Sequence, residues 1–236
     1  MTHTLFAPEV PKVNLKDVTL VCIDTLRPQA GANSIDICHH CCNFAATLFY
    51  TDVKDKLTSS KVTQIDCGKI DSLLAYNRFL SDYAWRHVQT THMMLCQWDG
   101  FVIDPRNWDW AWMELDFIGG SCHHKYWKQQ SINSGGFSMR SVKLMKNVSV
   151  LNPFVGMYHE DVMITETLRP VLTRTGFRFG NNEQCWHFCR NVAAQPESQC
   201  FGFHYFKDKD WKSIADVQLA NKKIVITSDV SQMPSE

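Results

Sequence analysis

The chain has 236 residues, of which 44% are hydrophobic, 20% charged and 12% aromatic, and its 24 Lys and Arg balance its 24 Asp and Glu. This composition is typical of a globular protein with a hydrophobic core, and the length favours a single domain over residues 1–236. A net charge of zero argues against a protein that binds nucleic acid or anionic membranes through its overall charge.

The N-terminal residues and the cysteines bear on the compartment. The start MTHTLFAPEVPKVNLKD has neither a basic leader nor a long apolar core, and no uncharged apolar run is long enough to span a membrane. We therefore expect a cytoplasmic protein (in the host cytoplasm if it is viral) whose ten cysteines are reduced.

Strands and helices alternate along the first half of the chain. Strands are predicted at 16–25, 45–52, 61–67 and 92–99, and helices at 33–43 and 71–88, the second capped by Asp71 or Ser72. This order predicts an α/β fold with a mainly parallel central sheet and helices on both faces. Ligands of such sheets bind outside the carboxyl ends of the strands, where Asp24, Asp52 and Asp99 would lie.

The second half of the chain is less regular. Residues 158–175 predict a helix that Pro170 kinks or interrupts, whereas residues 106–140 show no clear period. We expect a core over about residues 16–206 and a peripheral segment at 207–236.

Asp99 follows an apolar strand in LCQWDGFVIDP (95–105). A carboxylate at a strand end is well placed to hold a divalent cation such as Mg²⁺ or Mn²⁺. The alternative is that Asp99-Gly100 is a turn, because Asp-Gly is a common turn dipeptide.

Three further stretches carry candidate site residues, each with a structural alternative. SINSGGFSMRS (131–141) predicts either close backbone approach to a polyol or a Gly-Gly turn. In YHEDV (158–162), Glu160 or Asp161 would be a general base, or both would stabilise a helix N-terminus. His204 in FGFHYF (201–206) would be a ligand or a packed core residue.

Cysteine and histidine gather at CHHCC (38–42), at SCHH with Cys122, His123 and His124, and at CWHFC with Cys185, His187 and Cys189. Only Cys38 and Cys41 have the spacing of a zinc-ligand pair, and they lie in a predicted helix. Packing cysteines are favoured over structural zinc.

Taken in order, the stretches VTLVCIDT, FYTD, YNRF, QWDGFVIDP, DFIGG, NSGGFSMRS, HEDV and FGFH resemble a domain family whose members look like GT-A-type nucleotide-sugar glycosyltransferases. The resemblance runs from about residue 16 to about residue 206. It implies a GT-A-like, Rossmann-type fold and a transferase that moves a sugar from a nucleotide-sugar donor, a UDP-sugar, to an acceptor hydroxyl with the help of Mn²⁺ or Mg²⁺.

The resemblance also implies roles for individual residues. Asp99 and His204 would bind the metal, and Glu160 or Asp161 would be the base. The donor would meet Asp24, Thr25, Asp52, Tyr76, Asn77, Arg78, Gln97, Trp98 and Gly100. The donor sugar and acceptor would meet Asp116, Ser134, Gly135, Gly136 and Phe137. The family's D-x-D motif reads Gln97-Trp98-Asp99 here, so an amide replaces the first carboxylate. Metal binding would then be weaker, or the metal site would close only with the donor present.

The acceptor implied is a glycan, a lipid or a protein, or a hydroxylated base in phage DNA, for which RSVKLMK (140–146) and KDKDWK (207–212) would supply basic patches. Two other classes remain open. One is a non-catalytic module that binds sugar nucleotides or glycans, with Gln97 marking lost metal binding. The other is a zinc-stabilised interaction protein.

Overall fold

The computed structural model describes residues 11–122, 132–151, 159–191 and 199–204. All of them belong to one compact unit, Pro11–Tyr205. The predicted peripheral segment 207–236 lies outside the described residues, so the single-domain organisation stays a prediction.

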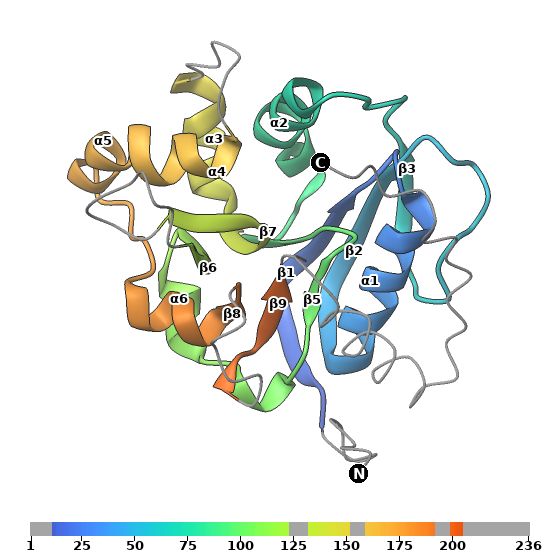
Figure 1. The fold of residues 1–236 in the computed structure, drawn as a ribbon, viewed down its shortest axis with the longest axis horizontal. Helices are drawn as coiled ribbons and strands as arrows, with labels where there is room; N and C mark the ends of the chain where they lie inside the picture. Colours follow the sequence, from blue (N-terminus) through green and yellow to red (C-terminus); the bar gives the residue numbers. More distant parts are fainter. Residues whose placement is uncertain (1–10, 123–131, 152–158, 192–198, 205–236) are drawn as a thin grey trace. The chain divides into compact units, whose positions relative to one another are not determined.

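A six-stranded sheet in the order β3-β2-β1-β4-β7-β6 forms the centre of this unit (Figure 1). Its strands are β1 (Val13–Ile23), β2 (Cys42–Thr51), β3 (Thr63–Asp66), β4 (His92–Cys96), β6 (Phe117–Cys122) and β7 (Ile132–Ser141). The first four strands are parallel to one another, and β7 is antiparallel to both of its neighbours. The predicted α/β fold with a mainly parallel sheet is confirmed.

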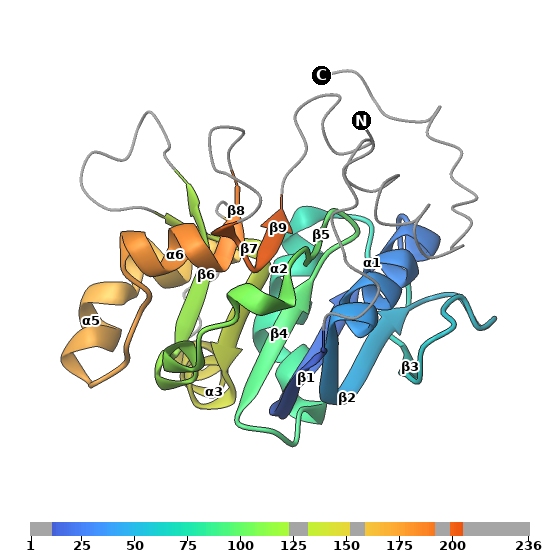
Figure 2. The same cartoon turned by 90° about the horizontal axis from the view of Figure 1, so that it is seen from below.

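Helices cover both faces of the sheet (Figures 1 and 2). The helices are α1 (Pro28–Cys41), α2 (Leu73–Asp82), α3 (Val142–Leu151), α4 (Glu160–Val162), α5 (Arg169–Arg174) and α6 (Asn182–Phe188). Gly31 of α1 lies against the side chains of Cys22 and Phe49 on one face. On the other face, Tyr50 donates a hydrogen bond to the Ala84 carbonyl, just after α2.

The core follows the alternation of side chains along the buried strands. Val21 and Ile23 of β1 belong to the same hydrophobic cluster as Leu80 of α2 and Leu144 of α3. The last six residues of β1, the last five of β2 and all five of β4 are buried, as expected where helices cover both faces of a parallel sheet. No helix within the described ranges has the length and apolar character needed to cross a membrane.

Several predicted boundaries are shifted, each for a local reason. α1 begins at Pro28 rather than at residue 33, because proline suits the first position of a helix. The strand predicted at 92–99 ends at Cys96, and residues 97–99 make a turn. α2 ends at Asp82 and a 3₁₀ helix, Ala84–His87, follows, because Tyr83 leaves the helical region with φ of −126°.

The helix predicted over 158–175 is interrupted well before Pro170. α4 passes into a π-helical turn, Met163–Thr167, and α5 begins afresh at Arg169. Two further 3₁₀ helices, Pro105–Asn107 and Trp110–Glu114, lie in the stretch without a clear period.

A small second sheet, in the order β5-β9-β8, brings distant residues to the end of β4. Its strands are β5 (Gly100–Val102), β8 (Cys189–Arg190) and β9 (Gly202–His204). Gly100 is directly opposite His204 in the antiparallel pair of β5 and β9. His204 is therefore held beside Asp99.

Candidate functional site

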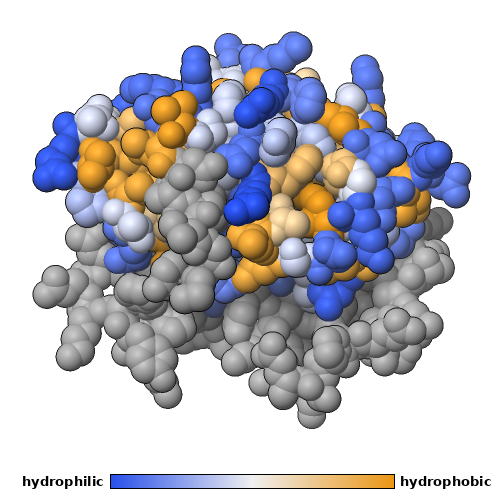
Figure 3. Space-filling view, turned by 90° about the horizontal axis from the view of Figure 1, so that it is seen from above, coloured by the Kyte–Doolittle hydropathy of each residue, from blue (hydrophilic) through white to orange (hydrophobic). Residues whose placement is uncertain are grey.

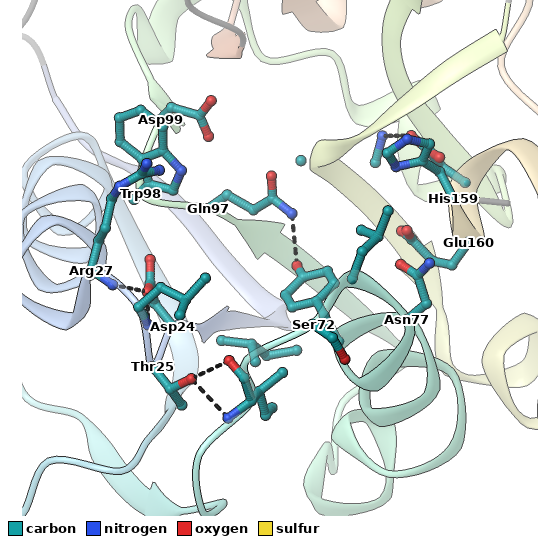
Figure 4. A pocket seen from close by; sticks show the side chains of 18 of the residues that line it. Asp24, Thr25, Arg27, Ser72, Asn77, Gln97, Trp98, Asp99, His159 and Glu160 are labelled. Carbon is teal, nitrogen blue, oxygen red and sulfur yellow. Dashed lines mark hydrogen bonds between the residues drawn. The ribbon is translucent and has the colours of Figure 1, made fainter. Parts of the chain in front are cut away.

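A cavity of about 460 Å³ lies at the carboxyl ends of β1 and β4 (Figure 4). Its walls come from the segments after β1 and β4, the start of α2, the middle of β7, the start of α4 and the end of β9. The lining residues are Ile23, Asp24, Thr25, Leu26, Arg27, Ile70, Ser72, Leu73, Tyr76, Asn77, Gln97, Trp98, Asp99, Gly135, Gly136, His159, Glu160, Asp161 and His204. This is the position at which parallel α/β sheets bind ligands.

The segment after β1 is a fixed turn. Asp24 Oδ1 accepts hydrogen bonds from the backbone N–H groups of Leu26 (3.0 Å) and Arg27 (2.5 Å). Burial raises the pKa of Asp24, although these two donors oppose the shift. Thr25 both donates to and accepts from the backbone of Ile70, which ties this turn to the segment before α2. Asp24 therefore shapes the wall from which Arg27 projects.

The segment after β4 is a second fixed turn, and it carries Asp99. Ser34 of α1 donates a 2.8 Å hydrogen bond to the carbonyl of Trp98, and the N–H of Gly100 binds the carbonyl of Gln97. The Gln97 amide donates to Tyr76 Oη at 2.8 Å, so its oxygen is left to face the site. The turn predicted for Asp99-Gly100 is thus confirmed, and Asp99 also lines the cavity, whereas its role as a metal ligand stays a prediction.

Asp99 and His204 face each other across 3.8 Å, between Oδ1 and Nε2. Burial raises the pKa of Asp99 and lowers that of His204, and in each case it outweighs their mutual attraction. His204 Nδ1 lies 3.2 Å from the Asn191 amide oxygen and 2.8 Å from Ser134 Oγ. A proton on Nδ1 would satisfy the amide oxygen and would leave a lone pair on Nε2. Asp99 Oδ1 is buried and accepts no hydrogen bond within the described ranges.

These atoms fit a divalent cation. A buried carboxylate oxygen and an imidazole nitrogen lie 3.8 Å apart, and both are Lewis bases when unprotonated. A cation would satisfy both, and the oxygen of Gln97 is the neutral third group on the same side of the cavity. Figure 4 shows Gln97 extending between Asp99 and Trp98 on one side and Asn77 and Glu160 on the other.

Gly135 and Gly136 lie inside β7, not in a turn, which corrects one of the two expectations for SINSGGFSMRS. The pairing of β6 with β7 shifts here, from Gly119 opposite Ser138 to Gly120 opposite Ser134. The extra residues of β7 bulge toward the cavity. A Cβ on Gly136 would overlap the His204 ring and lie 2.5 Å from Gln97 Oε1, so only glycine leaves this space open.

The start of α4 contributes two carboxylates in different environments. Glu160 forms an ion pair with the fully buried Arg140, 2.6 Å from Oε1 to Nη2. Asp161 Oδ2 accepts the backbone N–H of Gly135 at 2.7 Å. Burial and the neighbouring Glu160 raise the pKa of Asp161 to about 6, near the value that suits a general base at neutral pH.

Of the residues expected to meet donor, metal or acceptor, most line the cavity: Asp24, Thr25, Tyr76, Asn77, Gln97, Trp98, Asp99, Gly135, Gly136, Glu160, Asp161 and His204. Ser134 does not line it but supports it, since its hydroxyl binds His204 Nδ1 at 2.8 Å. Gly100 and Phe137 are buried next to it, Gly100 beside Phe137 Cβ.

The other three expected residues lie away from the cavity. Asp52 follows β2 and is not part of the wall, and Arg78 is on the exposed side of α2. Asp116 accepts hydrogen bonds from Ser141 Oγ (2.6 Å) and the Arg178 N–H (2.9 Å), so it joins β6, β7 and the segment after α5.

The cavity also contains residues that were not expected in a site: Ile23, Leu26, Arg27, Ile70, Ser72, Leu73 and His159. Ser72 was expected only as a helix cap, and its side chain does accept from the Ala75 N–H. The Arg27-Pro28 pair was a usable signal, because Pro28 marks the first turn of α1 and so places Arg27 at the strand-to-helix turn. His159 could have been included as the neighbour of Glu160.

Within the described ranges, no group of three or more His, Cys, Asp or Glu side chains is arranged to hold a metal ion. Cys38 and Cys41 are buried in α1, as expected of packing cysteines, and the described cysteines form no disulfide. His123 and His124 lie outside the described residues, and so does the 207–212 run.

No curated protein matches the chain. Among solved structures, one similar chain is a glycosyltransferase involved in the glycosylation of the major capsid of PBCV-1, at 14% identity and a TM-score of 0.50, over 86% of this chain and 98% of that one. Another is the apo-form glycosyltransferase GlyE of Streptococcus pneumoniae TIGR4, at 14% identity and a TM-score of 0.47, over 92% of this chain and 66% of that one. At this identity the first likeness shows the fold alone.

The model of the family described as "Protein of unknown function (DUF5672)" matches residues 59–204. That range is more than half of the chain and includes β4, the Gln97–Asp99 turn, the β7 bulge, α4 and His204. The chain belongs to the DUF5672 family.

Proposed function

We propose that this protein is a glycosyltransferase that moves a sugar from a nucleotide-sugar donor, a UDP-sugar, to an acceptor hydroxyl. The observation that carries the proposal is the cavity at the carboxyl ends of β1 and β4, where Asp99 and His204 face each other beside Gln97 and the two carboxylates of α4. The fold shared with a glycosyltransferase involved in capsid glycosylation supports it.

Asp99, His204 and the amide oxygen of Gln97 would hold a divalent metal, Mn²⁺ or Mg²⁺. When bound, the metal neutralises negative charge on the diphosphate as it leaves the sugar. Gln97 in place of a carboxylate makes the site one charge less negative. We therefore expect weaker metal binding in the absence of the donor.

The chain's own residues would orient and activate the acceptor. Asp161 would take the proton of the attacking hydroxyl, because its raised pKa of about 6 suits a general base near neutral pH. Glu160 would keep its ion pair with Arg140 and would contact the sugar. The bulge at Gly135 and Gly136 leaves room for the donor sugar between these carboxylates and His204.

The acceptor would be a hydroxyl on a glycan, a lipid or a protein, or on a hydroxylated DNA base.

A second function, a non-catalytic module that binds sugar nucleotides, is favoured by one observation, the amide at Gln97. The two functions differ in turnover of the donor, not in binding.

A screen of nucleotide sugars by thermal shift, with and without Mn²⁺, tests the proposal. A UDP-sugar at a hundred times its Kd should stabilise the protein by about 2.7 kcal/mol, or a rise in Tm of about 5 °C or more. Asp99→Asn should abolish the gain that Mn²⁺ adds and lower donor turnover at least about a hundredfold. Asp17→Asn is the control, because Asp17 is exposed on β1 and does not line the cavity.

Stabilisation by UDP-sugars without turnover, in the presence of a wide set of acceptors and water, would identify the binding module instead. No stabilisation by any nucleotide sugar, together with an Asp99→Asn variant that behaves like the wild type, would contradict both functions.

A further inference from the structure

The charges around the cavity are unequal. Asp24, Asp99, Glu160 and Asp161 all line it, whereas Arg27 is the one described lining residue with a permanent positive charge. Arg140 forms an ion pair with Glu160, but it is buried in the protein and does not line the cavity. A polyphosphate that enters this cavity would therefore meet carboxylates on most sides, and Arg27 is where it would find a fixed cation.

The position of Arg27 is built by three contacts. Asp24 fixes the turn through the Arg27 N–H. The guanidinium lies over the ring of Trp98, 4.4 Å from its centroid, and Ser34 anchors Trp98 through its carbonyl. Figure 4 shows Arg27, Trp98 and Asp99 together on one side of the cavity.

The guanidinium has capacity left for a ligand. Arg27 is exposed and forms no ion pair with a carboxylate among the described residues, although its charge opposes the rise in pKa that burial causes at Asp24 and Asp99. A guanidinium stacked on an indole keeps its N–H groups at the ring edge, where they can bind phosphate oxygens in pairs. The N-terminus of the 14-residue helix α1 follows directly and favours the same negative charge.

We propose that Arg27, held flat on Trp98, binds the phosphate groups of the donor and supplies a share of donor affinity that needs no metal. This inference rests on the proposed function, because it takes the ligand to be a nucleoside diphosphate sugar. It also accounts for Gln97, since a site with one carboxylate fewer can tolerate weak metal binding when an arginine holds the phosphates.

Isothermal titration calorimetry with UDP and with uridine, each with and without Mn²⁺, tests the inference. Arg27→Gln removes the charge and keeps a side chain of similar polarity. It should weaken UDP binding about tenfold or more both with and without Mn²⁺, and should leave uridine binding unchanged. Arg27→Lys should recover only part of the affinity, because lysine keeps the charge but lacks the planar fork.

Arg178→Gln is the matched control, because Arg178 is also exposed but pairs with Glu114 away from the cavity. Trp98→Phe should keep most of the UDP affinity and Trp98→Ala should lose it, since only the first retains a ring for stacking. Tm measurements on each variant report any loss of folding.

The outcomes separate the inference from the proposed function. Equal UDP affinity in the wild type and Arg27→Gln overturns the inference and leaves the glycosyltransferase intact. An equal loss for UDP and uridine also overturns it, because the arginine would then only shape the cavity. A wild-type protein that binds no nucleoside diphosphate contradicts the proposed function, and the inference with it.

Discussion

Arg140 and Glu160 form an ion pair whose side chains are 0% and 7% exposed. Arg140 also binds the Gly135 carbonyl and Ser138 Oγ, so this one side chain joins α4 to the bulge of β7. Removing one partner of such a pair leaves the other charge buried and unpaired, which costs more than the pair itself contributes. Arg140 therefore holds Glu160 against the β7 bulge.

Replacing Arg140 by methionine should lower the free energy of unfolding by about 3–5 kcal/mol, because the buried Glu160 would lose its ion-pair partner. The matched control is Arg178→Met, whose pair with Glu114 is 61% and 70% exposed and should cost about 1 kcal/mol or less. Chemical denaturation measures both. The double variant Arg140→Met with Glu160→Gln should recover part of the loss. A single variant no less stable than the Arg178→Met control would contradict this account.

The strands differ in how well the sequence alone predicts them, and β7 with its bulge is one that it does not predict. β1, β2 and β4 are buried apolar runs that end on polar residues, and that pattern is visible in the chain itself. The strand character of GGFS depends instead on hydrogen bonding to β4 and β6, so a Gly-Gly pair alone suggests a turn.

The site residues and the end of α2 also divide into features that the local sequence indicates and features that depend on distant parts of the chain. Asp99 was predictable because it closely follows a buried strand, and Glu160 because it starts a helix. Arg27 was missed because α1 was expected to begin at residue 33, five residues after its actual start at Pro28. The early end of α2 could not be predicted locally. It coincides with the hydrogen bond from Tyr50, on a distant strand, to the Ala84 carbonyl.

In β7, the substitution Gly136→Ala should fill the space that the bulge leaves open in the cavity. Its Cβ would overlap the His204 ring, which is held by Ser134 and cannot move freely. We expect a loss of about 1–3 kcal/mol in stability and at least tenfold weaker binding of UDP with Mn²⁺.

The control for this variant is Gly68→Ala. Gly68 has nothing within 4 Å of an added Cβ, but its φ of +65° disfavours alanine. It should cost about 1 kcal/mol in stability without weakening UDP binding. Thermal melts and calorimetry measure the two effects. A Gly136→Ala variant that keeps full UDP affinity would show that this space is not part of the donor site.

The hydropathy and charge of the protein surface indicate which acceptors the protein can bind. Figure 3 shows hydrophobic residues in separate groups among hydrophilic ones on the face that it displays. The balanced charge of 24 basic and 24 acidic residues gives no overall attraction to phosphates. The basic run at 140–146 also exposes fewer cations than its sequence contains. In 140–146, Arg140 is buried against Glu160, and only Lys143 and Lys146 are exposed.

We therefore expect no strong binding to duplex DNA, even when it contains hydroxylated bases. Fluorescence anisotropy with a labelled duplex should give a Kd no tighter than about 100 μM at physiological salt, and the affinity should fall by no more than about sixteenfold between 50 and 200 mM NaCl. Two exposed lysines release few counterions, so the slope of log K against log salt should be no steeper than about −2. A slope of about −4 or steeper, with binding that prefers the hydroxylated duplex, would instead make DNA the acceptor. In that case basic residues outside the described ranges, such as the run at 207–212, would have to supply the contacts.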